Sequence, residues 1–241
     1  MHACTQIFMK CTVFGLALSL GSAGYTQEVV RIAATPQAPD VVVENDLASG
    51  PAVDLITRVI SELGFKPSVV VTPNYGRAFN DLRSGSADIM AFCTRNAERD
   101  LVAVHFPLAA KVVYAWYSKA GSSLDVGSDS FKEKTPVGAF LNSNTGQWLT
   151  DNGYKNLVGI STFDSMARML DMGRVPVVFA VAAAFEGSMV KEQFAAGKFD
   201  KKVQVERTVG FYFSNAWLQA HPNMEQKIRA SIAKHDYAVK R

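Results

Sequence analysis

The sequence contains few of the residue types that bind metals, form disulfides or perform covalent catalysis. Its 241 residues include three cysteines and four histidines, and the histidines are scattered without the spacing of a metal site. Neither a phosphate-binding loop nor a serine nucleophile elbow is present. We therefore expect no metal, no cofactor and no catalytic residue, and a fold that is stabilised by its hydrophobic core.

Charge of one sign is not concentrated in any part of the chain. Lysine and arginine together number 25 against 22 acidic residues, which gives a net charge of +3 at pH 7. Proteins that bind nucleic acid or an anionic membrane surface usually carry a clustered basic stripe, and this sequence has none. We therefore expect no nucleic-acid partner.

Long apolar runs are missing too, apart from a short one near the N-terminus. The apolar residues 11–20 follow a lysine and precede a group of small residues. This pattern is typical of a cleavable secretory signal, and the run is shorter than the roughly 20 apolar residues that cross a bilayer as a helix. We predict a signal peptide at residues 1–24 and a periplasmic mature chain. The better-shaped signal begins at Met9, so translation from either Met1 or Met9 stays open.

One cysteine remains after signal cleavage. Cys4 and Cys11 fall within the signal, which leaves Cys93 without a partner for an internal disulfide. His105 follows Cys93 along the chain, but nothing in the sequence places the two side chains within hydrogen-bond reach, as a catalytic thiol and its base require. We expect Cys93 to be a small buried hydrophobe.

Beyond the signal, apolar patterns alternate between strand and helix. Strands are expected at residues 29–34, 67–72 and 87–93. Between them, residues 52–64 and 75–85 have helical periodicity, and each ends in a glycine. An order of strand, helix, strand, helix, strand predicts a parallel sheet of the α/β class.

The same pattern recurs later in the chain. Residues 82–93 and 170–181 each contain a leucine, two spacers, a glycine that ends a helix, two more spacers and an apolar strand. Residues 135–149 likewise resemble a first strand, a polar turn and a helix start. Two α/β units of similar build, rather than one continuous sheet, are the simplest account.

Two β-rich, aromatic segments separate these units. Residues 110–122 and 201–214 are expected to be strands that cross between two lobes, and residues 217–236 to form a closing helix that begins near Pro222. We therefore expect two α/β lobes joined by two hinge strands, with a ligand cleft at the strand ends. The predicted division is residues 25–115 plus 205–241 for the first lobe, and residues 116–204 for the second.

Several short motifs, in this order and spacing, also indicate a family. They are residues 50–64 (GPAVDLITRVISELG), the helix at 75–85, LRSGSADIM at 82–90, the spacing from Thr94 to Arg99, FP at 106–107, VGAFLNSNTG at 137–146, LDMGRV at 170–175, and YFSNA at 212–216 before the last helix. With them the mature chain resembles the periplasmic solute-binding proteins of ABC transporters, family 3, the polar amino acid binding type. The resemblance is to a poorly characterised branch of that family.

The resemblance implies a type II periplasmic-binding-protein-like fold that closes on a small-molecule ligand. The expected partner is an ABC permease, or alternatively a receptor, in the inner membrane, and the expected oligomeric state is a monomer. A second alternative is a small-acid lyase, a dehydratase, on the same fold, because a few relatives use cleft carboxylates in that way. A ligand-sensing role with the receptor would use the same cleft without a permease.

The resemblance also assigns roles to residues of the first lobe. Thr94 and Arg99 match the pair that holds a ligand carboxylate, whereas Arg95 is expected to be a flanking loop charge. Tyr75 matches an aromatic platform against the ligand, although it could equally pack at a helix start. Arg77 could add a second positive charge to the cleft, or could pair with the aspartate one helical turn later.

In the second lobe the matching loop precedes a helix start. Ser143, Asn144 and Thr145 would offer free N–H groups and the positive end of a helix dipole to an anion. The same residues could be helix caps, and the two roles are compatible.

One position departs from the amino acid binders. Their carboxylate that accepts the ligand's ammonium is replaced here by Val181, and Pro176 replaces a common acidic residue. Asp40 or Glu186 could supply a carboxylate from elsewhere. Because an ammonium without an acceptor is costly to bury, we expect an anionic or neutral ligand such as a small carboxylate.

Overall fold

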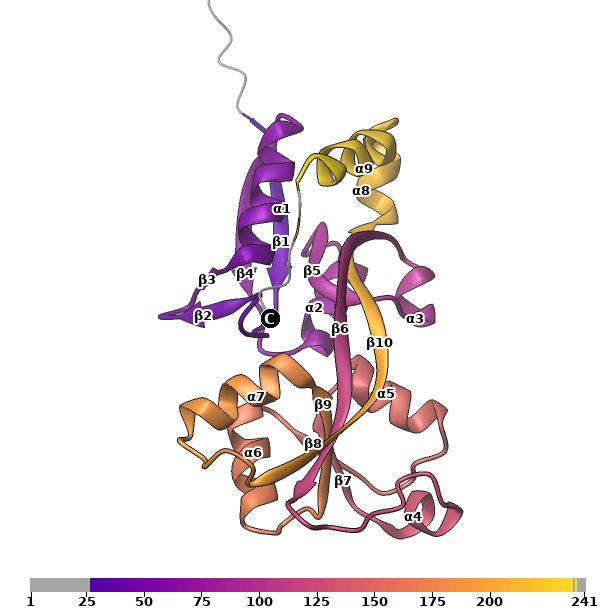
Figure 1. Ribbon diagram of the computed structural model, residues 1–241. Helices are drawn as coiled ribbons and strands as arrows, with labels where there is room; N and C mark the ends of the chain where they lie inside the picture. Colours follow the sequence, from indigo (N-terminus) through magenta and orange to yellow (C-terminus); the bar gives the residue numbers. More distant parts are fainter. Residues whose placement is uncertain (1–26, 236, 238–241) are drawn as a thin grey trace, which may run out of the picture.

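The computed structural model describes residues 27–235 and 237, and shows two α/β lobes (Figure 1). The predicted signal peptide lies outside the described residues. None of the helices within residues 27–235 is long and apolar enough to cross a membrane.

The first lobe is built on a three-stranded parallel sheet. Its strands are β1 (Val29–Ala34), β4 (Lys66–Val71) and β5 (Ile89–Thr94). Its helices are α1 (Pro51–Glu62), α2 (Tyr75–Ser84), α3 (Ala97–Asp100), α8 (Asn215–Ala220) and α9 (Met224–Lys234). A small hairpin of β2 (Val42–Glu44) and β3 (Leu47–Ser49) extends from the lobe beside α1 (Figure 1).

Local sequence explains where these elements begin and end. Helix α1 begins with Pro51, whose fixed φ suits a first helical turn, and buries an apolar face. Asn74 caps α2 by accepting a hydrogen bond from the Arg77 N–H, and Gly85 ends the helix with φ of 76°. The parallel order of strand and helix predicted from the sequence is confirmed for this lobe.

The second lobe repeats this build on a smaller scale. Its strands are β7 (Val137–Phe140), β8 (Leu157–Ile160) and β9 (Val177–Val181), all parallel. Its helices are α4 (Asp129–Lys134), α5 (Asn144–Asp151), α6 (Phe163–Asp171) and α7 (Ala182–Lys191). Gly173 separates α6 from β9 with φ of 70°, as Gly85 separates α2 from β5, so the internal repeat has a structural counterpart.

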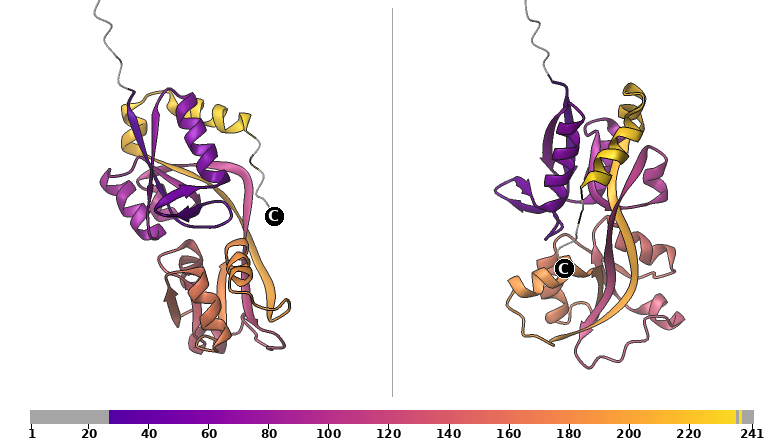
Figure 2. Two further views of the ribbon diagram at one scale, coloured as in Figure 1. Left: turned by 90° about the vertical axis from the view of Figure 1, so that its left-hand side faces the viewer. Right: turned by 45° about the horizontal axis from the view of Figure 1, so that its top comes forward.

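Two long antiparallel strands run through both lobes. Strand β6 (Ala103–Lys119) pairs with β10 (Phe199–Ser214) from one end to the other (Figures 1 and 2). In the first lobe β10 also pairs with β5, and in the second lobe β6 also pairs with β9.

These pairings correct the expectation of two separate sheets. Hydrogen bonds join the strands of both lobes into one eight-stranded sheet, in the order β4-β1-β5-β10-β6-β9-β7-β8. Strand β6 begins at Ala103, seven residues before the predicted start at residue 110, because it continues into the first lobe, whereas the predicted bounds of β10 differ from the observed strand by two residues. The two lobes therefore share one sheet, and its central pair, β6 and β10, connects them.

The C-terminal helix is also divided. Residues Asn215–Ala220 form α8, and α9 begins only at Met224, two residues after Pro222. A proline interrupts a helix that precedes it, and Asn223 has φ of 70°, which turns the chain between the two helices. Both helices pack on the first lobe (Figure 2).

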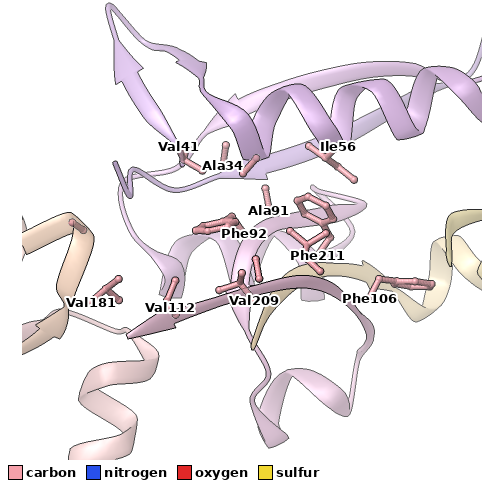
Figure 3. Packing of buried hydrophobic residues seen from close by; sticks show 14 of the residues in the cluster. Ala34, Val41, Ile56, Ala91, Phe92, Phe106, Val112, Val181, Val209 and Phe211 are labelled. Atoms are coloured by element: carbon pink, nitrogen blue, oxygen red, sulfur yellow. The ribbon is translucent and has the colours of Figure 1, made fainter. Parts of the chain in front are cut away.

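The largest hydrophobic cluster among the described residues contains side chains of both lobes. In Figure 3, Ile56 lies above Phe92, and Phe106, Val112 and Val209, from the two long strands, lie below Phe92. Val181, at the end of β9 in the second lobe, lies alongside Val112 (Figure 3). Apolar side chains thus reach the boundary between the lobes.

Candidate functional site

A small cavity of about 30 Å³ lies where the two lobes meet. Its polar wall in the first lobe and on β6 consists of Gln37, Tyr75, Thr94, Arg99 and Tyr114. The second lobe adds Ser143, Asn144 and Thr145. Cys93 and apolar side chains complete the wall: Phe92, Val112, Phe140, Phe163, Val181 and Val209. A cavity of this size is suited to a small ligand of a few heavy atoms.

Arg99 is the one charged side chain in this wall. It lies on α3 and is only 5% exposed. One guanidinium nitrogen donates to the Thr94 carbonyl at 3.3 Å, and the guanidinium lies 5.7 Å from the centre of the Tyr75 ring. Among the described residues it forms no ion pair. Buried charged groups in proteins are normally paired with a group of opposite charge. Because the Arg99 guanidinium has no acidic partner in the described part of the protein, this position favours an anionic ligand.

Tyr75 is held in place by an irregular strand. Its hydroxyl donates to Oε1 of Gln37 at 2.6 Å and also lies 3.1 Å from the Phe92 carbonyl. Phe92 has φ of 46° within β5, and the pairing of β10 with β5 shifts register between Gly210 and Tyr212. An aromatic residue with positive φ is uncommon and clusters at functional sites, and a bulge of this kind redirects side chains toward them.

Direct hydrogen bonds cross the cleft beside Arg99. The side-chain amide of Asn144 donates to the Thr94 carbonyl at 2.9 Å and also contacts the Thr94 hydroxyl. In turn, the Asn144 carbonyl oxygen accepts from the side-chain amide of Asn96 at 3.2 Å. The Thr94 hydroxyl also bonds to Tyr114 at 2.9 Å. The two lobes are therefore in direct contact beside Arg99, through the side chain of Asn144.

Helix α5 begins at the cavity wall. Ser143 caps it by accepting a hydrogen bond from the Gly146 N–H at 3.3 Å. The Ser143 hydroxyl donates to the Phe140 carbonyl and bonds to the Thr145 hydroxyl, both at 2.7 Å. The capping role predicted for this loop is therefore present. As in any helix, the N–H groups of the first turn of α5 have no partner within the helix.

The second lobe contributes mainly apolar surface. Phe140 stacks on Phe163, with ring centres 4.8 Å apart and the rings inclined by 30°. Val181, at the position of the missing ammonium acceptor, lines the cavity and is 9% exposed. No carboxylate is among the residues that line this cavity.

The structure does not bring Arg77 or Arg95 to the cavity. Arg77 is 64% exposed and pairs with Asp81 at 2.9 Å, which was the alternative drawn from the sequence. It lines an outer groove between the lobes instead. Arg95 is 73% exposed and pairs with Asp100 at 2.8 Å, as a flanking charge would. The other predicted binding residues all lie in the cavity wall.

Neither candidate carboxylate replaces the missing acceptor. Asp40 is buried outside the cavity wall and accepts a hydrogen bond from the Tyr237 hydroxyl at 2.7 Å. Burial raises the pKa of Asp40. Glu186 accepts from the Tyr117 hydroxyl at 2.7 Å and pairs with Lys201 at 2.6 Å. Each carboxylate is therefore engaged elsewhere in the fold.

Cys93 and His105 are close together but do not form a nucleophile and its base. The imidazole Nε2 of His105 lies 3.1 Å from the Cys93 carbonyl oxygen rather than binding the thiol. Burial raises the pKa of the Cys93 thiol to about 11, which keeps it protonated and unreactive at neutral pH. Within the described residues no group of His, Cys, Asp and Glu is placed to hold a metal ion.

Several residues of the site escaped the sequence analysis. They are Gln37, Phe92, Tyr114, Phe140 and Phe163 in the wall, and Asn96 across the cleft. Some signals were present: Phe140 ends the strand before the predicted loop, and Tyr114 lies in the aromatic crossing strand. Nothing in the sequence indicates the bulge at Phe92, which depends on pairing with a distant strand.

Comparison with known proteins shows a likeness in fold. No family model matches the sequence, and no curated protein matches it. A histidine kinase sensor domain with similarity to periplasmic binding proteins superposes with a TM-score of 0.73 and 13% identity, over 86% of this chain and 90% of that domain. EhuB in complex with hydroxyectoine gives 0.72 and 19%, over 86% and 82%. Holo ArgBP from T. maritima gives 0.67 and 15%, over 86% and 89%.

These comparisons confirm the predicted fold class. The chain has the two-lobed, periplasmic-binding-protein-like α/β fold, with two lobes joined by two strands. At identities below 20% the likeness concerns the fold and does not identify a ligand. The function must therefore be argued from the cavity.

Proposed function

We propose that this chain is an exported solute-binding protein that captures a small carboxylate-bearing solute between its lobes for an ABC-type importer. The observation that carries the proposal is Arg99, which lines the interlobe cavity, is 5% exposed and has no acidic partner among the described residues. A ligand carboxylate would bind its guanidinium through charge-assisted hydrogen bonds. The signal predicted at residues 1–24 supports export to the periplasm.

The geometry suggests how binding and closure are linked. Arg99 and Thr94 belong to the first lobe, whereas Asn144 and the start of α5 belong to the second. A carboxylate held by Arg99 would also meet the positive end of the α5 dipole when the lobes close. The ligand would then stabilise the closed form only by its better fit to that form. A membrane partner would recognise the closed form.

The structural relatives support a binding role. Structures of this fold have been determined with hydroxyectoine in EhuB and with arginine in ArgBP. Those ligands belong to those proteins, and the only charged side chain among the described residues that line this cavity is Arg99. The lyase alternative is less well supported, since no carboxylate that could serve as acid or base lines the cavity.

A sensory role is the second candidate, and one observation favours it. The sensor domain of a histidine kinase has the same fold over 90% of its length, with a TM-score of 0.73. The same cavity would then report ligand to a membrane receptor instead of delivering it to a permease. The two roles predict different losses when the protein is removed: uptake of the ligand if it serves a permease, and a response to the ligand if it serves a receptor.

The test begins with the ligand that the protein carries when it is purified without refolding. Native mass spectrometry should show an added mass, and the released compound should contain a carboxylate. Uptake of that compound in isotope-labelled form is then measured in cells with and without the protein. We expect uptake to fall when the protein is removed.

Three results would change the proposal. Unchanged uptake together with a lost transcriptional response to the compound would favour the sensory role. Conversion of many equivalents of the compound by the purified protein would establish a lyase. A carried ligand without any acidic group would remove the carboxylate from the proposal.

A further inference from the structure

Most polar groups of the cavity wall are already paired within the protein. The hydroxyl of Tyr75 donates to Gln37, and the hydroxyls of Tyr114 and Thr94 bond to each other. The hydroxyls of Ser143 and Thr145 are also paired, as described above. These groups fix the shape of the wall, and a polar ligand body would have to compete with internal hydrogen bonds.

The strongest polar groups of the wall that remain without a hydrogen-bond partner in the described part of the chain are donors. A guanidinium has five N–H donors, and Arg99 uses one in the described residues, on the Thr94 carbonyl. The amide nitrogen of Gln37 is a second donor at the wall, since only its oxygen has a partner among the described residues. No anionic acceptor is among the residues that line the cavity. The wall therefore offers one anion site and no site for a cation.

The remaining wall is apolar on both sides. Phe140, Phe163 and Val181 form it in the second lobe, and Val112 and Val209 face them from the two long strands. Burying a CH₂ group in such surroundings contributes about 0.8 kcal/mol, whereas burying a hydroxyl, an ammonium or a second carboxylate without a partner opposes binding. The cavity of about 30 Å³ limits the apolar part to a few carbons.

We infer that the ligand is a compact monocarboxylate with a short apolar body, without an α-amino group or a second acid. The carboxylate lies at Arg99 and Gln37, and the body lies against Phe163 and Val181. This inference rests on the proposed carboxylate-binding function and specifies the ligand class. It separates the site from one built for amino acids or dicarboxylates.

The test compares compounds that differ by one group. Isothermal titration calorimetry of the purified protein is run with acetate, butyrate, isobutyrate, hexanoate, succinate and L-2-aminobutyrate. Butyrate or isobutyrate should bind at least about tenfold more tightly than L-2-aminobutyrate, which adds only the ammonium, and than succinate, which adds a second carboxylate. Tenfold corresponds to about 1.4 kcal/mol. Hexanoate should bind more weakly than butyrate because the cavity limits the chain length.

Equal or tighter binding of L-2-aminobutyrate or succinate would overturn the inference and leave the carboxylate-binding function intact. Binding of none of the six would overturn both. A variant sharpens the result: Val181→Glu restores a carboxylate at the end of β9 and should reverse the preference between butyrate and L-2-aminobutyrate. The matched control is Val203→Glu, at a position on β10 that is 56% exposed, where the preference should not change. If Val181→Glu does not fold by circular dichroism, the six compounds with the native chain decide the question.

Discussion

The two lobes meet at the cavity with different chemistry. The first lobe presents Arg99, Tyr75 and Thr94, a cation with an aromatic ring and a hydroxyl beside it. The second lobe presents Phe163 and Val181, together with the capped start of a helix. We interpret the first lobe as the part that holds the anionic group and the second as the part that accepts or rejects the rest of the ligand.

The difference arises at equivalent positions of the internal repeat. Each lobe has a helix, a glycine in the left-handed region and a buried strand, β5 in one and β9 in the other. After β5 the chain makes a polar loop that leads to Arg99, whereas after β9 it enters α7 directly at Ala182. The same framework therefore carries a charged loop in one lobe and an apolar strand end in the other.

Arg99→Ala should have the largest effect on binding. Removing one partner of a buried charged pair costs roughly 2–5 kcal/mol, so the dissociation constant for butyrate should rise at least about thirtyfold. Calorimetry measures this change. Arg95→Ala is the control, because that side chain is exposed and pairs with Asp100, and it should bind as the native chain does. An unchanged affinity in Arg99→Ala would remove Arg99 from the site.

Gly76→Ala tests whether binding requires the lobes to meet. A Cβ at Gly76 would lie 2.9 Å from the Asn142 Cβ across the cleft, so the methyl group obstructs the closed arrangement only. Overpacking of this kind costs roughly 1–3 kcal/mol, and affinity should fall about fivefold or more. Small-angle scattering should show a larger radius of gyration at saturating ligand. The control is Gly187→Ala in α7, because a Cβ at that position would meet no atom of the described residues beyond its own helix within 4 Å and should leave binding unchanged.

The same affinity and the same scattering in Gly76→Ala and the native chain would show that the bound form does not bring these residues together. The second lobe would then contribute less to binding than its place in the cavity implies. In that case the first lobe alone would account for ligand binding.

Phe163→Ala measures the apolar contribution of the second lobe. The ring lines the cavity and stacks on Phe140, and its loss should weaken butyrate binding by about 1–1.5 kcal/mol, close to tenfold, from lost apolar contact. Acetate, which has one methyl group, should lose less. Phe194→Ala is the matched control, because Phe194 packs on Phe199 in the second lobe and does not line the cavity. An equal loss for acetate and butyrate would mean that Phe163 does not contact the ligand body.

Much of the fold could be predicted because local patterns determine it. Strand β1 and helix α2 follow directly from alternation, helical periodicity and glycine stops, and the predicted pair of crossing strands is present. The single continuous sheet was missed because the pairing of β10 with β5 and of β6 with β9 joins residues far apart in the chain. Pro222 indicated a boundary, but not that a separate helix α8 precedes it.

The site was predictable where a motif placed a residue, and not where packing did. The spacing from Thr94 to Arg99 located the charged loop, and the polar loop before α5 located the second-lobe contact. Gln37 and Phe163 reach the cavity only because distant elements fold together. Arg77 could not be decided from the sequence, since an arginine at a helix start suits a cleft and an ion pair equally well.

The smallest predicted effect concerns the pH dependence of stability and involves His105, a residue of the first lobe outside the cavity wall. Burial lowers the pKa of His105, so the folded protein holds this imidazole neutral where the unfolded chain, with a pKa of about 6.5, already takes up a proton. The unfolded state then binds more protons, and stability should fall as the pH is lowered from about 6.5 through the folded pKa. His105→Gln keeps a donor for the Cys93 carbonyl and cannot titrate, so it should flatten this part of the profile. Urea unfolding of both proteins at several pH values between 7.5 and 5 measures the difference. Butyrate affinity should stay level between pH 7.5 and 6, because His105 does not line the cavity. A parallel loss of affinity and stability over that range would instead place His105 in communication with the site.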